Sequence, residues 1–209
     1  MANPTTLPGD LIVPGNIRVN GSITPAIARA SILAQAVLQA FTVPWTLWRV
    51  HDALQTNLPG TAATDDLALI GGTFATASPT IQGVDFGGGN TTAYARAQIP
   101  LPWEHEAGQS VTLRFHAGIL TTEADASCTL DVECFETDEE AGISADLYAG
   151  AAQSIDSLVM ADIDFTITPT ALTAGDLLDV RIKVYGEDAG NLGVMIPCIG
   201  AVKLLCDVR

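Results

Sequence analysis

Lysine, aromatic residues (6%) and charged residues of any kind (16%) are all scarce in this chain of 209 residues. Lys183 and Lys203 are its lysines, and 24 acidic residues against 9 basic ones give a formal net charge of −15. An acidic surface repels phosphate backbones and anionic headgroups, so the composition argues against nucleic-acid binding and membrane docking. Hydrophobic residues make up 48% of the chain, which excludes general disorder.

Long hydrophobic runs are absent as well. The most apolar stretch, residues 26–41, is interrupted by Arg29, Ser31, Gln35 and Gln39, so it falls short of the roughly 18 apolar residues of a membrane span. Residues 1–4 contain neither a basic segment nor an apolar one of the kind found in secretory signals. We therefore expect a protein made in the cytoplasm.

Motifs for catalysis and metal binding are also missing. The sequence contains no CxxC, HExxH, G-x-S-x-G or P-loop motif, and its three histidines (His51, His105, His116) are dispersed. We therefore predict no enzymatic activity, no catalytic residue, no bound metal and no cofactor. Four cysteines lie in strand-like segments and are expected to be buried free thiols. A disulfide between strands is the alternative and would need an oxidising compartment.

A glycine recurs every six residues near the N-terminus, at Gly9, Gly15 and Gly21. Each glycine opens a phrase with two apolar positions, the pattern of a β-solenoid rung or an intertwined fibre. Three short repeats cannot bury their own apolar columns, because the core of such an array comes from stacked neighbours. The pattern therefore predicts an extended arm, residues 1–24, that associates with other copies of the chain.

Residues 25–42 are predicted to form a short helix, which Thr24 caps and Pro25 opens. Apolar residues follow a three-four spacing typical of a coiled-coil seam. A three-helix bundle and a single helix packed on its own domain both fit. The predicted trimer and anchor interface comprises apolar residues of the arm and helix: Leu11, Val13, Ile17, Val19, Ile23, Ile27, Ala34, Val37 and Phe41.

From residue 43 onward the pattern has period two with turn residues between short apolar runs. The predicted strands cover residues 46–52, 67–75, 80–86, 93–101, 110–120, 128–136, 158–168, 177–185 and 193–207. Residues 138–157 are predicted to form a long loop with a short helix. Eight or nine such strands indicate an antiparallel β-sandwich, most naturally a jelly roll, over residues 43–209.

A few residues could carry a site. Glu104 and Glu106 flank His105, but neighbouring side chains on a strand point to opposite faces, so a surface loop anchored by Trp103 is the expected arrangement. Asp162 and Asp164 share a strand face and could contribute to a calcium site, although a solvated strand is favoured. Trp45 and Trp48 are expected to anchor the core rather than to form a sugar platform.

The order of arm, short helix and terminal jelly roll resembles the trimeric decoration, head-fibre and tail-fibre proteins of tailed bacteriophages. The resemblance rests on the Gly9/Gly15/Gly21 repeat and on the runs 95–102, 111–114, 164–168 and 175–182. It implies a virion location, a homotrimer, and attachment to the major capsid protein or other virion proteins. The arm is short for a fibre, which favours a capsid-surface decoration protein.

Three functions are therefore weighed. The first is a structural virion protein anchored by its N-terminal arm. The second is a receptor- or glycan-binding module of a tail fibre or spike, which the low aromatic content disfavours. The third is a cupin-like metalloenzyme, which would need clustered histidines that this sequence does not have.

Overall fold

The structure is a computed structural model. It describes residues 37–63, 65–75, 78–86, 89–121, 126–137, 145–169, 172–188 and 194–208. Residues 36–209 form one compact unit, separate from residues 1–35, and every described element belongs to it. The predicted arm and residues 25–36 of the predicted helix lie outside the described residues.

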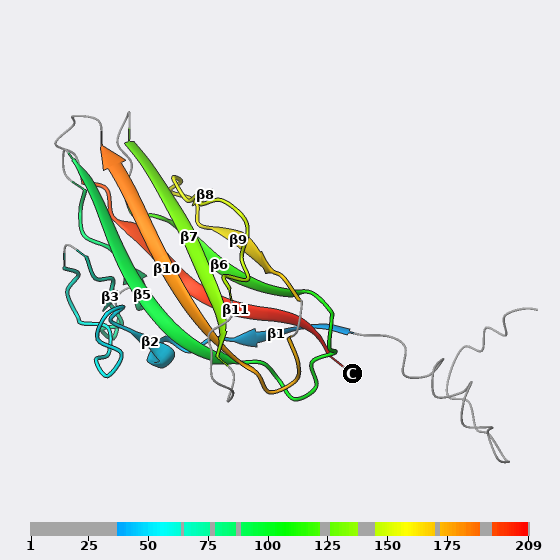
Figure 1. Cartoon of the computed structure of the whole chain (residues 1–209). Coiled ribbons are helices and arrows are strands. Elements are labelled where there is room, and N and C mark those ends of the chain that lie inside the picture. Colours follow the sequence, from blue (N-terminus) through cyan, green and yellow to red (C-terminus); the bar gives the residue numbers. More distant parts are fainter. Residues whose placement is uncertain are drawn as a thin grey trace, which may run out of the picture. The chain divides into compact units, whose positions relative to one another are not determined.

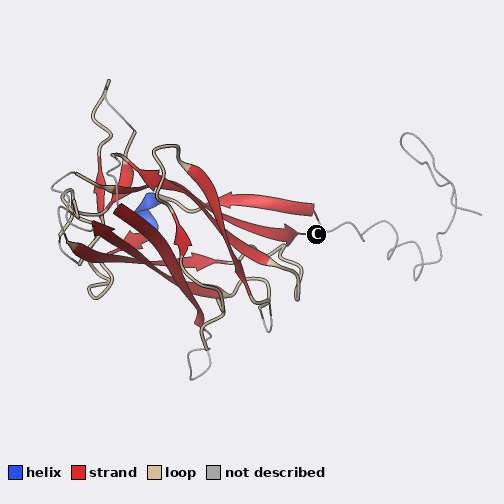
Figure 2. Cartoon of the chain, turned by 90° about the horizontal axis from the view of Figure 1, so that it is seen from above, coloured by secondary structure: helices blue, strands red, loops and turns tan. Residues whose placement is uncertain are grey.

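The described part consists of eleven strands and one 3-10 turn, shown in Figure 1 and, by type, in Figure 2. The elements are β1 (Val37–Thr42), η1 (Trp45–Leu47), β2 (Trp48–Arg49), β3 (Ala68–Ile70), β4 (Thr80–Gln82), β5 (Asn90–Pro100), β6 (Val111–Ile119), β7 (Ala126–Thr137), β8 (Gln153–Ser154), β9 (Ala161–Ile167), β10 (Leu177–Asp188) and β11 (Pro197–Val208). No helix among the described residues has the length and apolar character to cross a bilayer.

The strands form two antiparallel sheets. One sheet has the order β3-β4-β11-β6-β9, with β1 also paired to β11, and the other has the order β2-β5-β10-β7-β8. From β4 to β7 successive strands alternate between the two sheets. β8 lies in the same sheet as β7, and β9, β10 and β11 then alternate between the sheets again, which places β11 between β4 and β6. This is the connectivity of a jelly roll, and the predicted all-β sandwich is confirmed.

Alternating burial along the long strands shows why this sequence folds into two facing sheets. In β6, Val111, Leu113 and Phe115 are fully buried, while Thr112 and Arg114 between them are partly exposed. Phe115 lies at the centre of an aromatic cluster, with ring centroids 6.2 Å from Trp48 and 5.6 Å from Phe165. Each such buried ring stabilises the fold by roughly 1.5–3 kcal/mol.

The predicted helix over residues 25–42 is wrong at its C-terminal end. Residues 37–42 form strand β1, which pairs along its whole length with β11, from Val37 opposite Val208 to Thr42 opposite Lys203. Hydrogen bonding to β11 outweighs the local helical spacing that placed Val37 and Phe41 on a seam. The sandwich therefore begins six residues before the predicted boundary at residue 43.

Most predicted strands are present, with shifted ends. Of the strand predicted over residues 46–52, only residues 48–49 form a strand, β2, and a 3-10 turn over residues 45–47 precedes it. The two-residue strand β8 falls in the predicted long loop, and the predicted short helix is not found in its described part, residues 145–157. Local periodicity cannot reveal a strand of this length, which exists only through its partner β7.

Candidate functional site

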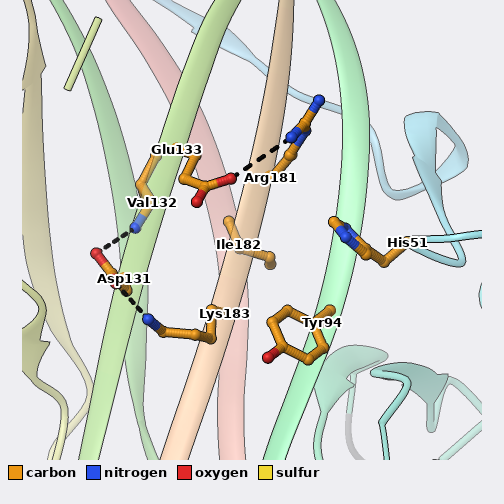
Figure 3. A pocket seen from close by; sticks show the side chains of 8 residues that line it. All are labelled: His51, Tyr94, Asp131, Val132, Glu133, Arg181, Ile182 and Lys183. Atoms are coloured by element: carbon orange, nitrogen blue, oxygen red, sulfur yellow. Dashed lines mark hydrogen bonds and ion pairs between the residues drawn. The ribbon is translucent and has the colours of Figure 1, made fainter. Parts of the chain in front are cut away.

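The outer face of the five-stranded sheet holds a shallow hollow lined by charged and aromatic side chains (Figure 3). Its volume is about 130 Å³. Lys183 lies 2.7 Å from Asp131, and Arg181 lies 3.6 Å from Glu133. The ring of His51 lies 5.2 Å from that of Tyr94 at its rim.

The strongest interaction of this face is the ion pair beside the hollow. The Asp179 carboxylate is only 1% exposed and accepts two hydrogen bonds from Arg96, at 2.5 and 2.6 Å, and two from Arg181, at 3.1 and 3.2 Å. Arg181 also lies over the Phe135 ring, 4.4 Å from its centroid. The charges of this face thus pair with each other across β5, β10 and β7.

Because these charges pair with one another, we interpret this face as a stabilising network of ion pairs between strands rather than as a binding site. The hollow is well below the roughly 300 Å³ at which small-molecule pockets begin. The Asp131 carboxylate also raises the pKa of Lys183 by hydrogen bonding, which favours the charged form of the lysine.

A similar arrangement occupies the outer face of the other sheet. Arg114 of β6 donates two hydrogen bonds to Asp164 of β9, at 2.6 and 2.7 Å, and His116 contacts Asp162 at 2.9 Å. The hydrogen bond with His116 lowers the pKa of Asp162. The two carboxylates weighed as calcium ligands thus have cationic partners on the neighbouring strand.

Two larger hollows lie at one end of the sandwich, which we call the β1 end. Val37 and Val208 are paired at this end. The loops 101–110 and 172–176 lie here as well, because the strand ends that they connect are paired here, Pro100 with Leu177 and Val111 with Cys206. The β1 groove, about 470 Å³ in volume, lies at this end and is mainly apolar. Its lining includes Phe41, Leu47, Ile99, Leu101, Trp103 and Leu204.

Trp103 forms the rim of the groove and is 83% exposed. Its indole lies directly on the backbone of Gly175, where an added Cβ would be 2.8 Å from the ring, and Gly175 has a positive φ of 88°. The indole also lines a more polar hollow of about 530 Å³, together with Gln98, Thr137 and Asp176 among others. Glycine is required here for both the turn and the close approach of the ring.

The prediction for the loop around Trp103 is therefore wrong in its detail. Trp103 was expected to anchor the loop, but the anchor is His105, which is 5% exposed and forms a bridge with Val208. Neither ring nitrogen of His105 has a partner among the described residues. Glu104 is exposed, so the imidazole and this carboxylate do point apart, as predicted.

The other candidate residues fall mainly in the core. Trp48 is 1% exposed and Trp45 packs partly buried against the core, as expected for core anchors. All four cysteines are buried and free, as predicted. Burial raises the pKa of both Cys128 and Cys134 to about 12. Within the described ranges, no three His, Cys, Asp or Glu side chains converge as metal ligands.

Of the predicted interface residues, Val37 and Phe41 lie on β1, and Phe41 lines the β1 groove. The remaining seven lie outside the described residues: Leu11, Val13, Ile17, Val19, Ile23, Ile27 and Ala34. Sequence reasoning missed Leu38 and Trp103 as exposed apolar side chains at the β1 end, and Leu101 as part of the groove lining. An exposed tryptophan between prolines and acidic residues was the available signal.

The fold defines the chain as an antiparallel β-sandwich protein of jelly-roll connectivity. No protein-family model and no curated protein matches it. A solved structure with a similar arrangement is the CBM22-1 xylan-binding domain from Paenibacillus barcinonensis Xyn10C. The identity is 10% and the TM-score 0.34, over 69% of this chain and 83% of that chain.

Proposed function

We propose that this chain is a structural protein of a bacteriophage virion, a homotrimeric capsid decoration or head-fibre protein. Its N-terminal arm, residues 1–24, attaches it to the major capsid protein or to another virion protein. The sandwich of residues 37–208 then forms the projecting body. Assembly takes place in the host cytoplasm, and the protein has no catalytic role.

The observation that carries the proposal is the position of the chain where it enters the sandwich. Val37 lies opposite Val208, so the described chain enters the sandwich at the β1 end, beside the end of the last strand. The exposed apolar side chains Leu38 and Trp103 and the β1 groove lie at the same end. One end of the body thus combines features for attachment.

The composition of the core supports the same proposal. Buried side chains from residues 43–208 alone form the main hydrophobic cluster of the described part. A body that forms its own core leaves the apolar columns of the arm available to partners. Linking three arms in one particle would also multiply weak contacts with a capsid, because linked sites raise the effective concentration.

Deletion of residues 1–24 tests this function. The truncated protein should remain a folded sandwich by circular dichroism and melt cooperatively, but it should lose the trimeric mass, three copies of 21.8 kDa. It should also fail to co-sediment with capsids that lack the protein, whereas full-length Val159→Lys should bind normally. Decoration of capsids by the truncated protein would refute the arm as the anchor.

A receptor- or glycan-binding module is the second candidate, and the exposed indole of Trp103 favours it. Pyranose rings stack on such platforms, and Gln98 and Asp176 beside the indole could supply hydrogen bonds. A glycan array that gives hits with the full-length protein and none with Trp103→Ala would favour this alternative. An array without hits leaves the structural role.

A further inference from the structure

Strand β1 has one open edge. Among the described residues it pairs with β11 and with no other strand, so its outer backbone N–H and C=O groups have no strand partner. Native proteins generally cover such an edge or protect it with charge or proline. β1 reads Val-Leu-Gln-Ala-Phe-Thr and contains neither. Leu38 on this strand is also 64% exposed.

The β1 groove lies directly beside this edge, because Phe41 and Thr42 of β1 form part of its lining. Its volume of about 470 Å³ is about three times that of the cavity of roughly 150 Å³ that binds benzene. It therefore has room for a few aliphatic side chains. An open strand edge next to an apolar groove is the geometry with which proteins bind an extended peptide as an added strand.

We propose that residues 9–25 of a neighbouring copy of this chain bind here, as a strand added to β1 with apolar side chains in the β1 groove. This inference rests on the proposed function, since it assigns the contact through which the arm would hold the trimer together. Backbone hydrogen bonds to β1 would supply affinity, and the groove would select the aliphatic positions of the repeat.

Length, pattern and charge favour this occupant. Residues 1–36 precede β1 and, at roughly 3.3 Å per residue, can span about 120 Å when extended, which is ample for reaching an adjacent copy. The repeat carries Leu11 and Val13, then Ile17 and Val19, as alternate aliphatic pairs suited to an added strand.

The charges of the two parts are also complementary. Residues 1–36 contain two arginines and one aspartate, which gives them a net charge of +1. Because the whole chain has a net charge of −15, residues 37–209 have a net charge of −16. Glu104 and Asp176 lie at the Trp103 rim. Arg18 in the second repeat would therefore approach an acidic surface.

Site-specific photocrosslinking of the full-length protein tests the inference. Ala40 on β1 is exposed, so Ala40→Cys can carry a benzophenone maleimide, while the four native thiols are buried. Labelled protein is mixed with ¹⁵N-enriched protein, reassembled, irradiated and digested with trypsin. Cleavage after Arg18 and Arg29 releases the repeats in two peptides, 1–18 and 19–29. We expect crosslinks from residue 40 to these peptides with mixed isotope composition, which identifies a contact between copies.

Val159→Cys provides the matched control. Val159 is 77% exposed and lies near the opposite end, beyond the strand end where Ile119 pairs with Pro197. Crosslinks of a single isotope composition, or none above this control, would overturn the inference. A trimeric mass in the same sample would then leave the proposed function intact, whereas a monomeric mass would overturn both.

A second measurement does not depend on crosslinking. Leu38→Lys combined with Trp103→Ala changes two exposed side chains and should leave the sandwich folded. Light scattering on dilution should show about a tenfold rise in the concentration at which half of the trimer dissociates, with Val159→Lys unchanged. An unaltered dissociation curve for the double variant would contradict the proposed contact.

Discussion

At the scale of single residues, the most constrained charge is Asp179. It is buried on the outer face of β10, and its carboxylate separates Arg96 and Arg181, which lie directly opposite each other in the strand register. Two guanidinium groups in such a position repel each other unless a carboxylate lies between them. Asp179 therefore fixes the pairing of β5 with β10.

Asp179→Asn should lower the free energy of unfolding by about 3 kcal/mol, because loss of one partner of a buried ion pair leaves uncompensated charge. Urea denaturation at pH 7 measures the change. Glu133→Gln, which alters an exposed partner of Arg181 at 3.6 Å, should cost well under 1 kcal/mol. Equal losses for the two variants would show that burial of Asp179 does not matter.

At the scale of elements, the inward face of β7 carries small and aliphatic side chains. On β7 these include Cys128, Leu130, Val132 and Cys134, all nearly inaccessible to solvent. The thiols act here as small hydrophobic groups. Their burial also raises their pKa, so almost no thiolate exists at neutral pH.

Ellman's reagent at pH 8 should therefore react with none of the four native thiols on the time scale of minutes, and with all four in guanidinium chloride without reductant. The reason is that burial raises the pKa of all four thiols; for Cys128 and Cys134 it reaches about 12, which leaves roughly one part in ten thousand as thiolate at pH 8. Ala40→Cys should react at once. Rapid reaction of the native wild-type protein, or fewer than four thiols in denaturant, would contradict this assignment.

At the scale of the whole molecule, charge is distributed very unevenly. Residues 37–209 carry a net charge of −16, and residues 1–36 carry +1. A net charge this far from zero keeps a protein soluble but destabilises the folded state through self-repulsion. The ion pairs of the described residues lie on both outer faces, and with 24 acidic residues against 9 basic ones the excess charge is negative.

Sodium chloride should therefore raise the melting temperature of the full-length protein at pH 7. We expect a rise of about 2–4 °C between low salt and 0.5 M, equivalent to about 1 kcal/mol, since salt screens surface charges beyond about a Debye length. Differential scanning calorimetry provides the measurement. Near the sequence pI of 4.2 the rise should vanish, and an equal rise at both pH values would rule out self-repulsion as the cause.

The sequence by itself determined the class of fold and most of the inward-facing residues. Alternation in segments such as 111–119 and 177–185 shows which side chains are buried, because a strand has a period of two whatever its partner is. It also indicated that Trp45 and Trp48 anchor the core and that the cysteines are buried.

Only the tertiary structure decided which strands pair and which surfaces stay open. Arg96 and Asp179 are 83 residues apart in the chain, and no local pattern reports such a contact. The helical spacing of residues 27–41 failed at β1 because pairing with β11 supplies backbone hydrogen bonds that a short alanine-rich helix cannot match. His105 anchors the loop in place of Trp103 for the same reason: the bridge to Val208 buries the histidine, and the turn at Gly175 holds the indole at the surface.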